Sequence, residues 1–309
     1  MLRNHTLKLS LITLSSAALM ACGSGKAPVT SSKAEISGKA VKGLIANGQV
    51  ELFGIAGGVQ QLLDSTVTDD QGDYQLDVPD TYSGPVKLVV TAVPGTTMLC
   101  DAPAGCDGVA FGEDMPLSVG TSMKAVMRNV LPNQPVNIYV TPLTNMAAAH
   151  AENAGLSAES IAAANEKVAN LFELPGNFVS IEPVNVTDAD SVAAAASSAV
   201  NYGVLAAAFA GGSAAELETR LNAYASAFAA DQLLEDSSDD SAPTVKDIFE
   251  PAANLAGFIN SGDIEAQYNS LIAGLSLGDT ASTGTSGSTN TSLDACLLYT
   301  SDAADEEDS

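Results

Sequence analysis

The chain is short of the side chains on which much enzyme chemistry depends. It contains no tryptophan and two histidines among 309 residues, and aromatic residues make up 5% of it. His5 lies in the N-terminal leader described below, which leaves His150 for the mature protein. A Ser-His-Asp triad needs a histidine as its base. His150 ends a short alanine run in a predicted helix and the chain has no Gly-x-Ser-x-Gly motif, so we expect a capping or surface histidine.

Other catalytic motifs are missing as well. The chain has no HExxH, GxGxxG, P-loop or Ser-x-x-Lys pattern. Acidic pairs such as Asp69-Asp70 and Asp239-Asp240 lie in turn-like or acidic contexts, where solvated carboxylates are the expectation. Nothing in the sequence selects one of them as a glycosidase pair. We therefore predict no catalytic residue, no bound metal and no cofactor.

Basic residues are scarce. The chain has 12 lysines and arginines against 37 aspartates and glutamates, which gives a formal net charge of −25. A surface of this charge repels nucleic acid and anionic lipid headgroups, so neither is expected as an electrostatic partner. Attachment to a membrane would have to come from acyl chains, each buried CH₂ contributing about 0.8 kcal/mol.

Long apolar runs are also absent. The run at 9–20 is shorter than the roughly 20 residues that a transmembrane helix needs. It follows a positively charged start, with Arg3 and Lys8, and ends in small residues. This pattern is typical of a cleaved secretory signal.

The end of this leader carries a more specific motif. Leu19-Met20-Ala21-Cys22 resembles the lipobox of bacterial lipoproteins, and an ordinary signal peptide with a chance cysteine is the alternative. The resemblance implies that residues 1–21 are removed and that Cys22 is acylated. Gly23 after the cysteine resembles lipoproteins sorted to the outer membrane, facing the periplasm or the medium. Residues 22–33 then combine the lipidated cysteine with a flexible, polar tether.

The remaining cysteines have separate explanations. Cys22 is the lipid site, and Cys296 lies in a terminal segment discussed below. Cys100 and Cys106 bracket a short segment whose Pro and Gly favour a tight turn, and exported proteins fold in oxidising compartments. We predict a disulfide between these two. Half of a metal site is the alternative, but no second Cys or His pair completes one.

Residues 34–140 show short β-type runs separated by turn residues, with a spacing typical of a β-sandwich. Asn47-Gly48 is a strong hairpin signal and predicts that the runs at 36–41 and 50–53 pair with each other. Further runs are expected at 62–68, 74–78, 86–93, 115–119, 123–130 and 136–140.

Part of this region resembles a known family. Ile36-x-Gly38 and Val67-Thr-Asp-x-x-Gly72-x-Tyr74-x-Leu76 resemble the carboxypeptidase regulatory-like domain, over roughly residues 34–93. The resemblance implies an Ig-like or transthyretin-like β-sandwich that stabilises or presents other parts, without peptidase chemistry. The runs after residue 93 would be extra strands, with the Cys100–Cys106 loop as an insertion.

An acidic turn joins two of the predicted strands. Asp69, Asp70 and Asp73 surround Gly72, which supplies a positive φ, and we expect a plain tight turn. These carboxylates are also a weak candidate for Ca²⁺. They lack the spacing and the distal glutamate of an EF-hand.

At Thr141 the apolar period changes from 2 to about 3.6, and residues 141–277 predict an alanine-rich helical bundle of five or six helices. Thr141 and Pro142 suit a helix N-cap and first position. A single long helix is expected after Asp188, and its alanines are too weakly apolar for a membrane span. Pro251 is expected to kink or split the helix that opens near Thr244.

The last residues differ from the rest of the chain. Residues 278–295 are rich in Gly, Ser and Thr and predict a linker. Residues 296–306 match a translated sequencing-library adapter in register, so we interpret 296–309 as an adapter-derived artefact. Whatever the natural protein carries after residue 295, whether an early stop or a further domain, is then absent from this sequence.

Three functional hypotheses follow. The first is a lipid-anchored, non-catalytic envelope module that presents a domain or contacts a protein or envelope partner. The second is a lipoprotein that binds carbohydrate or another small ligand, although such sites usually contain aromatic platforms, which are rare here. The third is a fragment of a surface enzyme whose catalytic domain lay beyond the linker.

Overall fold

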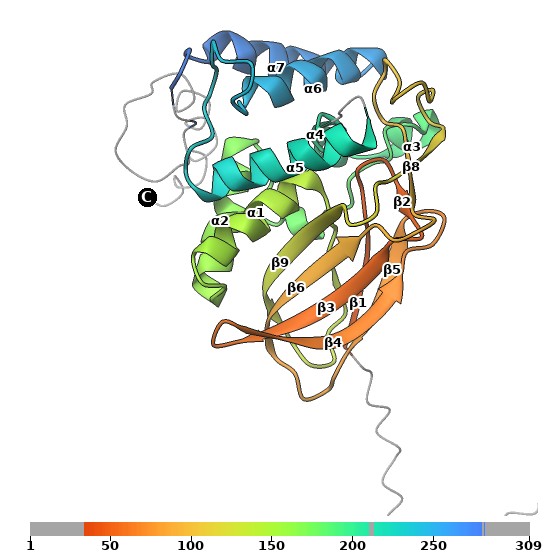
Figure 1. Ribbon diagram of the computed structural model, residues 1–309, viewed down its shortest axis with the longest axis vertical. Helices are drawn as coiled ribbons and strands as arrows, with labels where there is room; N and C mark the ends of the chain where they lie inside the picture. Colours follow the sequence, from red (N-terminus) through yellow and green to blue (C-terminus); the bar gives the residue numbers. More distant parts are fainter. Residues whose placement is uncertain (1–33, 210–212, 280, 282–309) are drawn as a thin grey trace, which may run out of the picture. The chain divides into compact units, whose positions relative to one another are not determined.

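A computed structural model describes residues 34–209, 213–279 and 281 (Figure 1). Cys22, the tether, most of the predicted linker and the adapter-like end lie outside the described residues. The strands are β1 (Ala34–Lys39), β2 (Ile45–Ala46), β3 (Gln49–Ala56), β4 (Val59–Val67), β5 (Asp73–Val78), β6 (Gly84–Thr91), β7 (Thr97–Leu99), β8 (Asp114–Pro116), β9 (Ser122–Val130) and β10 (Val136–Asn137).

The strands form three sheets. One has the order β4-β3-β6-β9, a second has the order β10-β1-β5, and a small third sheet has the order β2-β7-β8. Side chains alternate between core and solvent along β5, where Tyr74, Leu76 and Val78 are buried and the intervening residues are exposed. These three residues share one core with Leu52 and Leu88 of the four-stranded sheet.

Helices follow the strands, which confirms the predicted order of a β region and a helical region. They are α1 (Pro142–Asn153), α2 (Ala158–Leu171), a 3₁₀ turn at Phe178–Ser180, α3 (Ala189–Ala194), α4 (Ser197–Ala207), α5 (Ala214–Ala229), α6 (Lys246–Phe258) and α7 (Gly262–Gly274). Thr141 caps α1 and Ser213 caps α5, and both residues take part in capping boxes.

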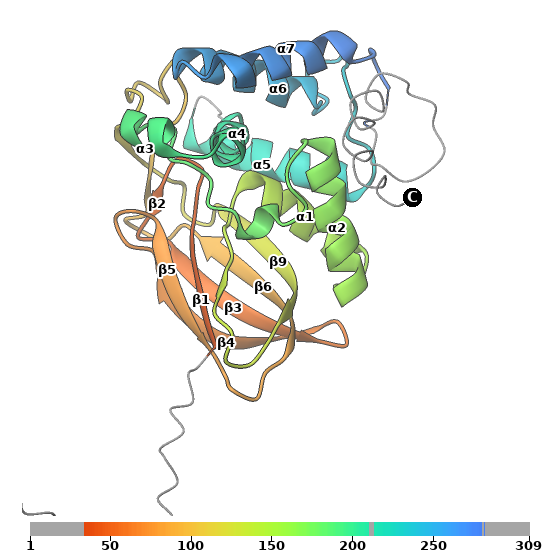
Figure 2. The same cartoon turned by 180° about the vertical axis from the view of Figure 1, so that it is seen from behind.

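The two regions share an apolar core. Helices α1 and α2 pack against strand β9, as both views of the ribbon show (Figures 1 and 2). The connection between β10 and α1 runs through this core, with Ile138, Tyr139, Val140 and Thr141 between 0% and 7% exposed. The first turn of α1 is therefore held against the β region by two contacts. One is the buried connection that leads into the helix, and the other is the packing of α1 on β9.

The expected hairpin at Asn47-Gly48 is not formed. Asn47 does adopt a positive φ of 59°, but β1 pairs with β5 and β10, and β3 pairs with β4 and β6. Instead, the amide of Asn47 donates to the carbonyl oxygen of Thr68, and the Gly48 amide donates to the Thr68 hydroxyl. The chain instead reverses at Lys42-Gly43, where Val41 and Leu44 form an antiparallel bridge, and Asn47-Gly48 links β2 to β3, which belong to different sheets.

The alanine-rich segment after Asp188 is two helices rather than one. Ala195 and Ala196 have extended ψ angles of 156° and 147° and separate α3 from α4. Helix α4 packs closely against the preceding segment, since a Cβ at Gly203 would lie 2.3 Å from the carbonyl oxygen of Val184. This packing redirects the chain, and it outweighs the helix propensity of the alanines.

Helix α6 is neither split nor interrupted at Pro251. It runs continuously from Lys246 to Phe258 with the proline inside it. Proline has no N–H, so the carbonyl oxygen of Asp247, four residues earlier, loses its helical donor. The Arg220 side chain of α5 donates to this oxygen at 3.1 Å from Nη2. A neighbouring helix thus supplies the missing hydrogen bond.

Cys100 and Cys106 form the predicted disulfide, with their Cα atoms 5.7 Å apart. Such a bond is typical of proteins that fold outside the cytoplasm. Within the described ranges, no helix has both the length and the apolar character needed to cross a membrane.

Candidate functional site

A polar cleft lies where β9, α1 and α5 meet, and we call it the β9–α1–α5 cleft. Its volume is about 460 Å³. It is lined by Ser122, Lys124, Asn145, Ala149, Glu152, Asn153, Asn222, Ala225, Ser226, Ala229 and Ala230. The alanines of α1 and α5 form narrow walls, and the longer polar side chains provide the hydrogen-bonding groups.

The start of α1 builds one side of this cleft. The Thr141 hydroxyl accepts from the Thr144 amide, which caps the helix. The Thr144 hydroxyl donates to the Lys124 carbonyl oxygen at 2.9 Å, and the Lys124 amide donates to Asn145 Oδ1 at 3.2 Å. Both backbone groups of Lys124 are thereby satisfied on the outer edge of β9, and the edge strand is closed by side chains of a helix.

A second helix extends this closure. The Asn165 side chain of α2 donates to the Val126 carbonyl oxygen at 3.1 Å, one pleat further along β9. Three helical side chains, Thr144, Asn145 and Asn165, therefore take the place of a neighbouring strand. This arrangement fixes the distance between β9 and the helices, and with it the width of the cleft.

A charged cluster occupies the floor of the cleft. Glu152 accepts from Lys87 at 3.0 Å through Oε1 and from Lys124 at 2.7 Å through Oε2. Burial raises the pKa of Glu152, but the hydrogen bonds and charges of Lys124 and Lys87 outweigh it and hold the pKa below its usual range. Two ammonium groups share one carboxylate, so the cluster of Lys87, Lys124 and Glu152 has one positive charge in excess, and the buried Lys87 lies behind the lining residues Lys124 and Glu152.

The polar groups at the rim are more accessible. Asn222 and Ser226 lie one turn apart on α5 and are exposed. Asn153 donates to the Ala229 carbonyl oxygen at 3.0 Å, which joins the ends of α1 and α5. Amide, hydroxyl and ammonium groups converge here, as in sites that bind small polar molecules. The lining includes no aromatic side chain.

His150 does not face the cleft. Its Nε2 lies 3.0 Å from Nζ of Lys167 in α2, and Lys167 also contacts the Asp231 carboxylate. Burial and the Lys167 charge lower the pKa of His150. Phe228 lies against the imidazole, with ring centroids 5.7 Å apart. The histidine is partly buried and joins α1 and α2 to the residues that follow α5.

In the acidic turn, the Asp69 carboxylate is occupied by hydrogen bonds from the backbone of the turn itself. Asp69 Oδ1 accepts from the amides of Gln71 and Asp73 at 2.8 and 2.9 Å. Gly72 has the positive φ of 74° that the turn requires. Across the part of the chain that the structure describes, no group of three or more Asp, Glu, His or Cys side chains is arranged to hold a metal ion. The weak Ca²⁺ candidate of Asp69, Asp70 and Asp73 gains no geometric support.

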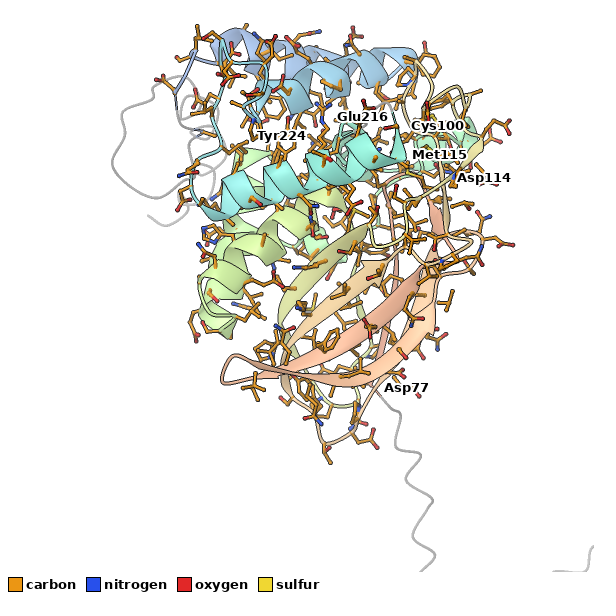
Figure 3. All side chains as sticks on the ribbon, in the orientation of Figure 1. Asp77, Cys100, Asp114, Met115, Glu216 and Tyr224 are labelled. Carbon is orange, nitrogen blue, oxygen red and sulfur yellow. A yellow bond between two sulfur atoms is a disulfide. The ribbon has the colours of Figure 1, made fainter. Side chains whose placement is uncertain are left out.

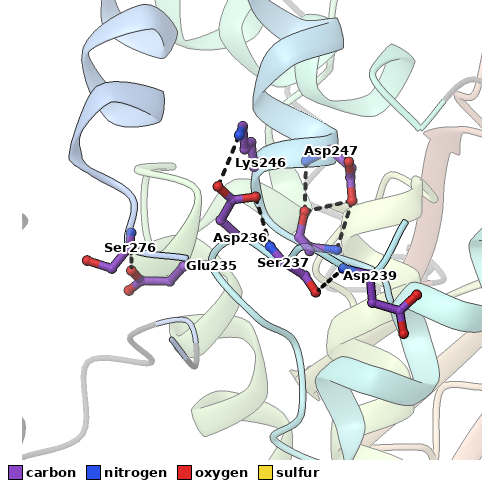
Figure 4. A network of polar contacts seen from close by, with 8 residues as sticks. Glu235, Asp236, Ser237, Asp239, Lys246, Asp247 and Ser276 are labelled. Atoms are coloured by element: carbon purple, nitrogen blue, oxygen red, sulfur yellow. Dashed lines mark hydrogen bonds and ion pairs between the residues drawn. The ribbon is translucent and has the colours of Figure 1, made fainter. Parts of the chain in front are cut away.

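The loop between α5 and α6 forms a second polar region, shown in Figure 4. Lys246 donates to Asp236 at 3.0 Å, and the Thr244 hydroxyl donates to Asp247 at 2.6 Å. These bonds occupy the carboxylates and hold the start of α6. The first residues of the predicted linker pack here too, with the Gly278 amide donating to the Asp236 carbonyl oxygen.

A groove of about 800 Å³ runs between this loop and α5. Glu216 and Tyr224, both on α5, line this groove and are labelled in Figure 3. Two of its charged side chains already serve the structure, since Arg220 holds the Asp247 carbonyl oxygen and Glu216 accepts from the Ser213 amide. We therefore regard the β9–α1–α5 cleft as the stronger candidate site.

The sequence does not single out this cleft. Its residues come from three elements between positions 122 and 230, and none belongs to a recognisable motif. One local signal was present in the run that starts α1, where Thr144 and Asn145 follow the helix cap. Polar residues on the buried face of an amphipathic helix indicate that they have partners to satisfy.

Comparisons with known proteins give little guidance. No protein-family model matches the chain, and no curated protein is similar to it. Among solved structures, a 9R-lipoxygenase from Cyanothece PCC8801 is similar to 49% of this chain at 11% sequence identity. The match covers 26% of the lipoxygenase chain and has a TM-score of 0.22, so it carries no information on fold or activity.

Proposed function

We propose that this is a lipid-anchored protein of the bacterial cell envelope, held in the outer membrane through Cys22. The observation that carries the proposal is Leu19-Met20-Ala21-Cys22 at the end of a charged and then apolar leader. The Cys100–Cys106 disulfide supports the same compartment, because such bonds persist outside the cytoplasm. The tether at 23–33 would hold the folded part away from the lipid headgroups.

The folded part is proposed as a non-catalytic module that presents a binding surface to a protein or envelope partner. The resemblance to the carboxypeptidase regulatory-like sandwich supports a presenting role. The helices packed against β9 support a rigid body, since backbone groups of the edge strand are bonded to helical side chains. A rigid body held by the tether that the sequence predicts would suit recognition at the membrane surface.

Cell fractionation tests the anchor. The wild-type chain should be recovered with the outer membrane and require detergent for extraction, and Cys22→Ala should be recovered in the soluble periplasmic fraction. The matched control is Ser24→Ala, two residues further on, which should stay in the membrane. Membrane recovery of Cys22→Ala would contradict the anchor. Protease treatment of intact cells distinguishes a surface-facing from a periplasmic protein.

A second function is favoured by the cleft. The exposed Asn222 and Ser226, with Lys124 on the floor, support the binding of a small polar ligand such as a carbohydrate. Hydroxyl-rich ligands are bound by convergent amide, hydroxyl and charged groups. The excess positive charge beside Glu152 favours ligands that carry a carboxylate or phosphate.

Ligand binding can be tested by blocking the cleft. A panel of neutral and acidic oligosaccharides should contain members that raise the Tm of the wild-type chain. Ser226→Trp should abolish the shift, because a tryptophan at this exposed position fills the cleft. Ser270→Trp, on an exposed position of α7, should keep it. Equal shifts in both variants would place binding elsewhere, and turnover of any panel member would contradict a non-catalytic role.

A further inference from the structure

Lys42 and Asp101 form a charged pair inside the β region. Lys42 follows β1 and Asp101 follows β7, and Lys42 Nζ lies 2.5 Å from Asp101 Oδ1. The lysine side chain is 1% exposed and the aspartate side chain is 0% exposed. Burial of two opposite charges has a large desolvation cost before their attraction is counted. Neutralisation of the pair would remove this desolvation cost.

The other oxygen of Asp101 is held by the backbone. The Gly43 amide donates to Asp101 Oδ2 at 2.6 Å. Gly43 has a φ of +59°, and a Cβ at this position would lie 1.9 Å from the Leu99 carbonyl oxygen. Any residue other than glycine would push these segments apart. The close approach of the Gly43 amide to the carboxyl group is thus built into the backbone.

The surroundings keep both groups in place. Ile45 of β2 pairs with Met98 of β7, and the Leu99 amide donates to the Leu44 carbonyl oxygen at 3.2 Å. The next residue, Cys100, is fixed by its disulfide and lies at the helix-facing end of the β region (Figure 3). Strand pairing and a covalent bond therefore hold Lys42 and Asp101 in register, which lowers the entropic cost of a reaction between them.

We propose that Lys42 Nζ and Asp101 Cγ become joined by an intramolecular isopeptide bond. Proton transfer within the pair first gives a neutral amine and a neutral carboxylic acid. The amine lone pair attacks Cγ, and the negative charge that develops on Oδ2 is stabilised by the Gly43 amide. Oδ1 takes a proton from the nitrogen and leaves as water. One N–C bond forms, one C–O bond breaks, and the step needs no oxidant, reductant or cofactor.

Two features of the site suit this reaction. Burial raises the pKa of Asp101, and this effect outweighs the lowering by Lys42 and Gly43, so this carboxyl group takes up a proton more readily than an exposed aspartate does. A void of about 10 Å³ borders Lys42 and is lined mainly by apolar side chains, among them Val90 and Met98. A void of this size is close to the roughly 10–15 Å³ that accommodates one water molecule.

The bond would close the chain around strands β2 to β7. Everything between Lys42 and Asp101 would lie inside a covalent loop, next to the smaller loop of the disulfide. A force applied at the N-terminal end would then pass from Lys42 to Asp101 without unfolding the intervening strands. This property does not depend on the proposed binding function.

Peptide mapping of the full chain decides the question. The purified protein is reduced, denatured and digested with trypsin, which cannot cut at an acylated Lys42. An isopeptide bond gives a branched peptide of residues 40–87 and 88–124, lighter by one water than the sum of its parts. Fragments 43–87 and 88–124 should then be absent as free linear peptides.

Lys42→Arg is the control, because arginine keeps the buried positive charge but does not form the amide. This variant should release linear 40–42 and 88–124 peptides. The wild-type digest is decisive even if the variant folds poorly. Quantitative release of linear 43–87 and 88–124 from the wild-type protein would overturn the proposal and leave a buried ion pair.

Discussion

The Arg220 guanidinium of α5 donates to the Asp247 carbonyl oxygen of α6, at the position where Pro251 removes the helical donor. The arginine therefore compensates for a proline inside a continuous helix. Arg220 also lies over the Tyr224 ring, 5.8 Å from its centroid, so the side chain is fixed on α5. Two helices that are separate in sequence depend on this contact.

A double-mutant cycle tests this dependence. Arg220→Ala should lower the free energy of unfolding by about 1–3 kcal/mol, because it leaves a carbonyl oxygen without a donor. In a Pro251→Ala background the helix supplies its own N–H, so the same substitution should cost about 0.5–1.5 kcal/mol less. Urea denaturation measures both values. Arg128→Ala, at an exposed position, is the control, and additive effects would refute the compensation.

The closure of β9 gives a second prediction. Thr144→Val keeps the shape of the side chain but removes the hydroxyl that donates to the Lys124 carbonyl oxygen. Because Thr144 is fully buried, we expect a loss of about 1–3 kcal/mol in the free energy of unfolding. Thr219→Val, on the exposed face of α5, should change it by about 0.5 kcal/mol or less. Equal losses in the two variants would contradict the role of Thr144.

A third prediction concerns pH. The pKa of His150 is lowered in the folded protein by burial and by Lys167, so the unfolded chain takes up the proton first. Stability should be constant above the ordinary histidine pKa of about 6.5 and should fall as pH drops below it. His150→Gln should flatten this part of the profile. Lys167→Gln should weaken it, since one of the two causes is removed. An unchanged slope in His150→Gln would exclude the histidine.

The disulfide gives a fourth prediction. Cys100 and Cys106 are six positions apart, so their bond restricts a short loop of the unfolded chain. The Cys100→Ala/Cys106→Ala double variant should lose less than the roughly 3 kcal/mol expected for a 15-residue loop. Thermal unfolding of both proteins measures the difference. Labelling of free thiols at both positions in the native wild type would contradict the bond.

Features that depend on neighbouring residues in sequence could be predicted. The cap at Thr141 and the turn at Gly72 were recognisable because each needs a few side chains at fixed offsets. The pairing of strands could not be predicted in this way, since the Asn47-Gly48 turn joins different sheets. Sheet order depends on contacts between distant segments, which local turn chemistry does not specify.

The candidate cleft could not be predicted from the sequence for a related reason. Lys124, Glu152 and Asn222 meet only because α1 and α5 pack together beside β9. Each of these residues alone resembles an ordinary surface residue. The break between α3 and α4 has the same origin, because the close approach of Gly203 to Val184 is a tertiary contact.

The buried connection from Ile138 to Thr141 has a consequence for anyone who wishes to engineer this protein. The β region cannot be separated from the helical region without exposing the core that the two share. A fusion that stops after β10 would uncover the apolar surface on which α1 and α2 rest, and it would leave the outer edge of β9 open to pairing with other chains. An isolated β region would be prone to aggregation. A fusion of this protein to another membrane anchor should therefore contain residues 34–281 as one unit.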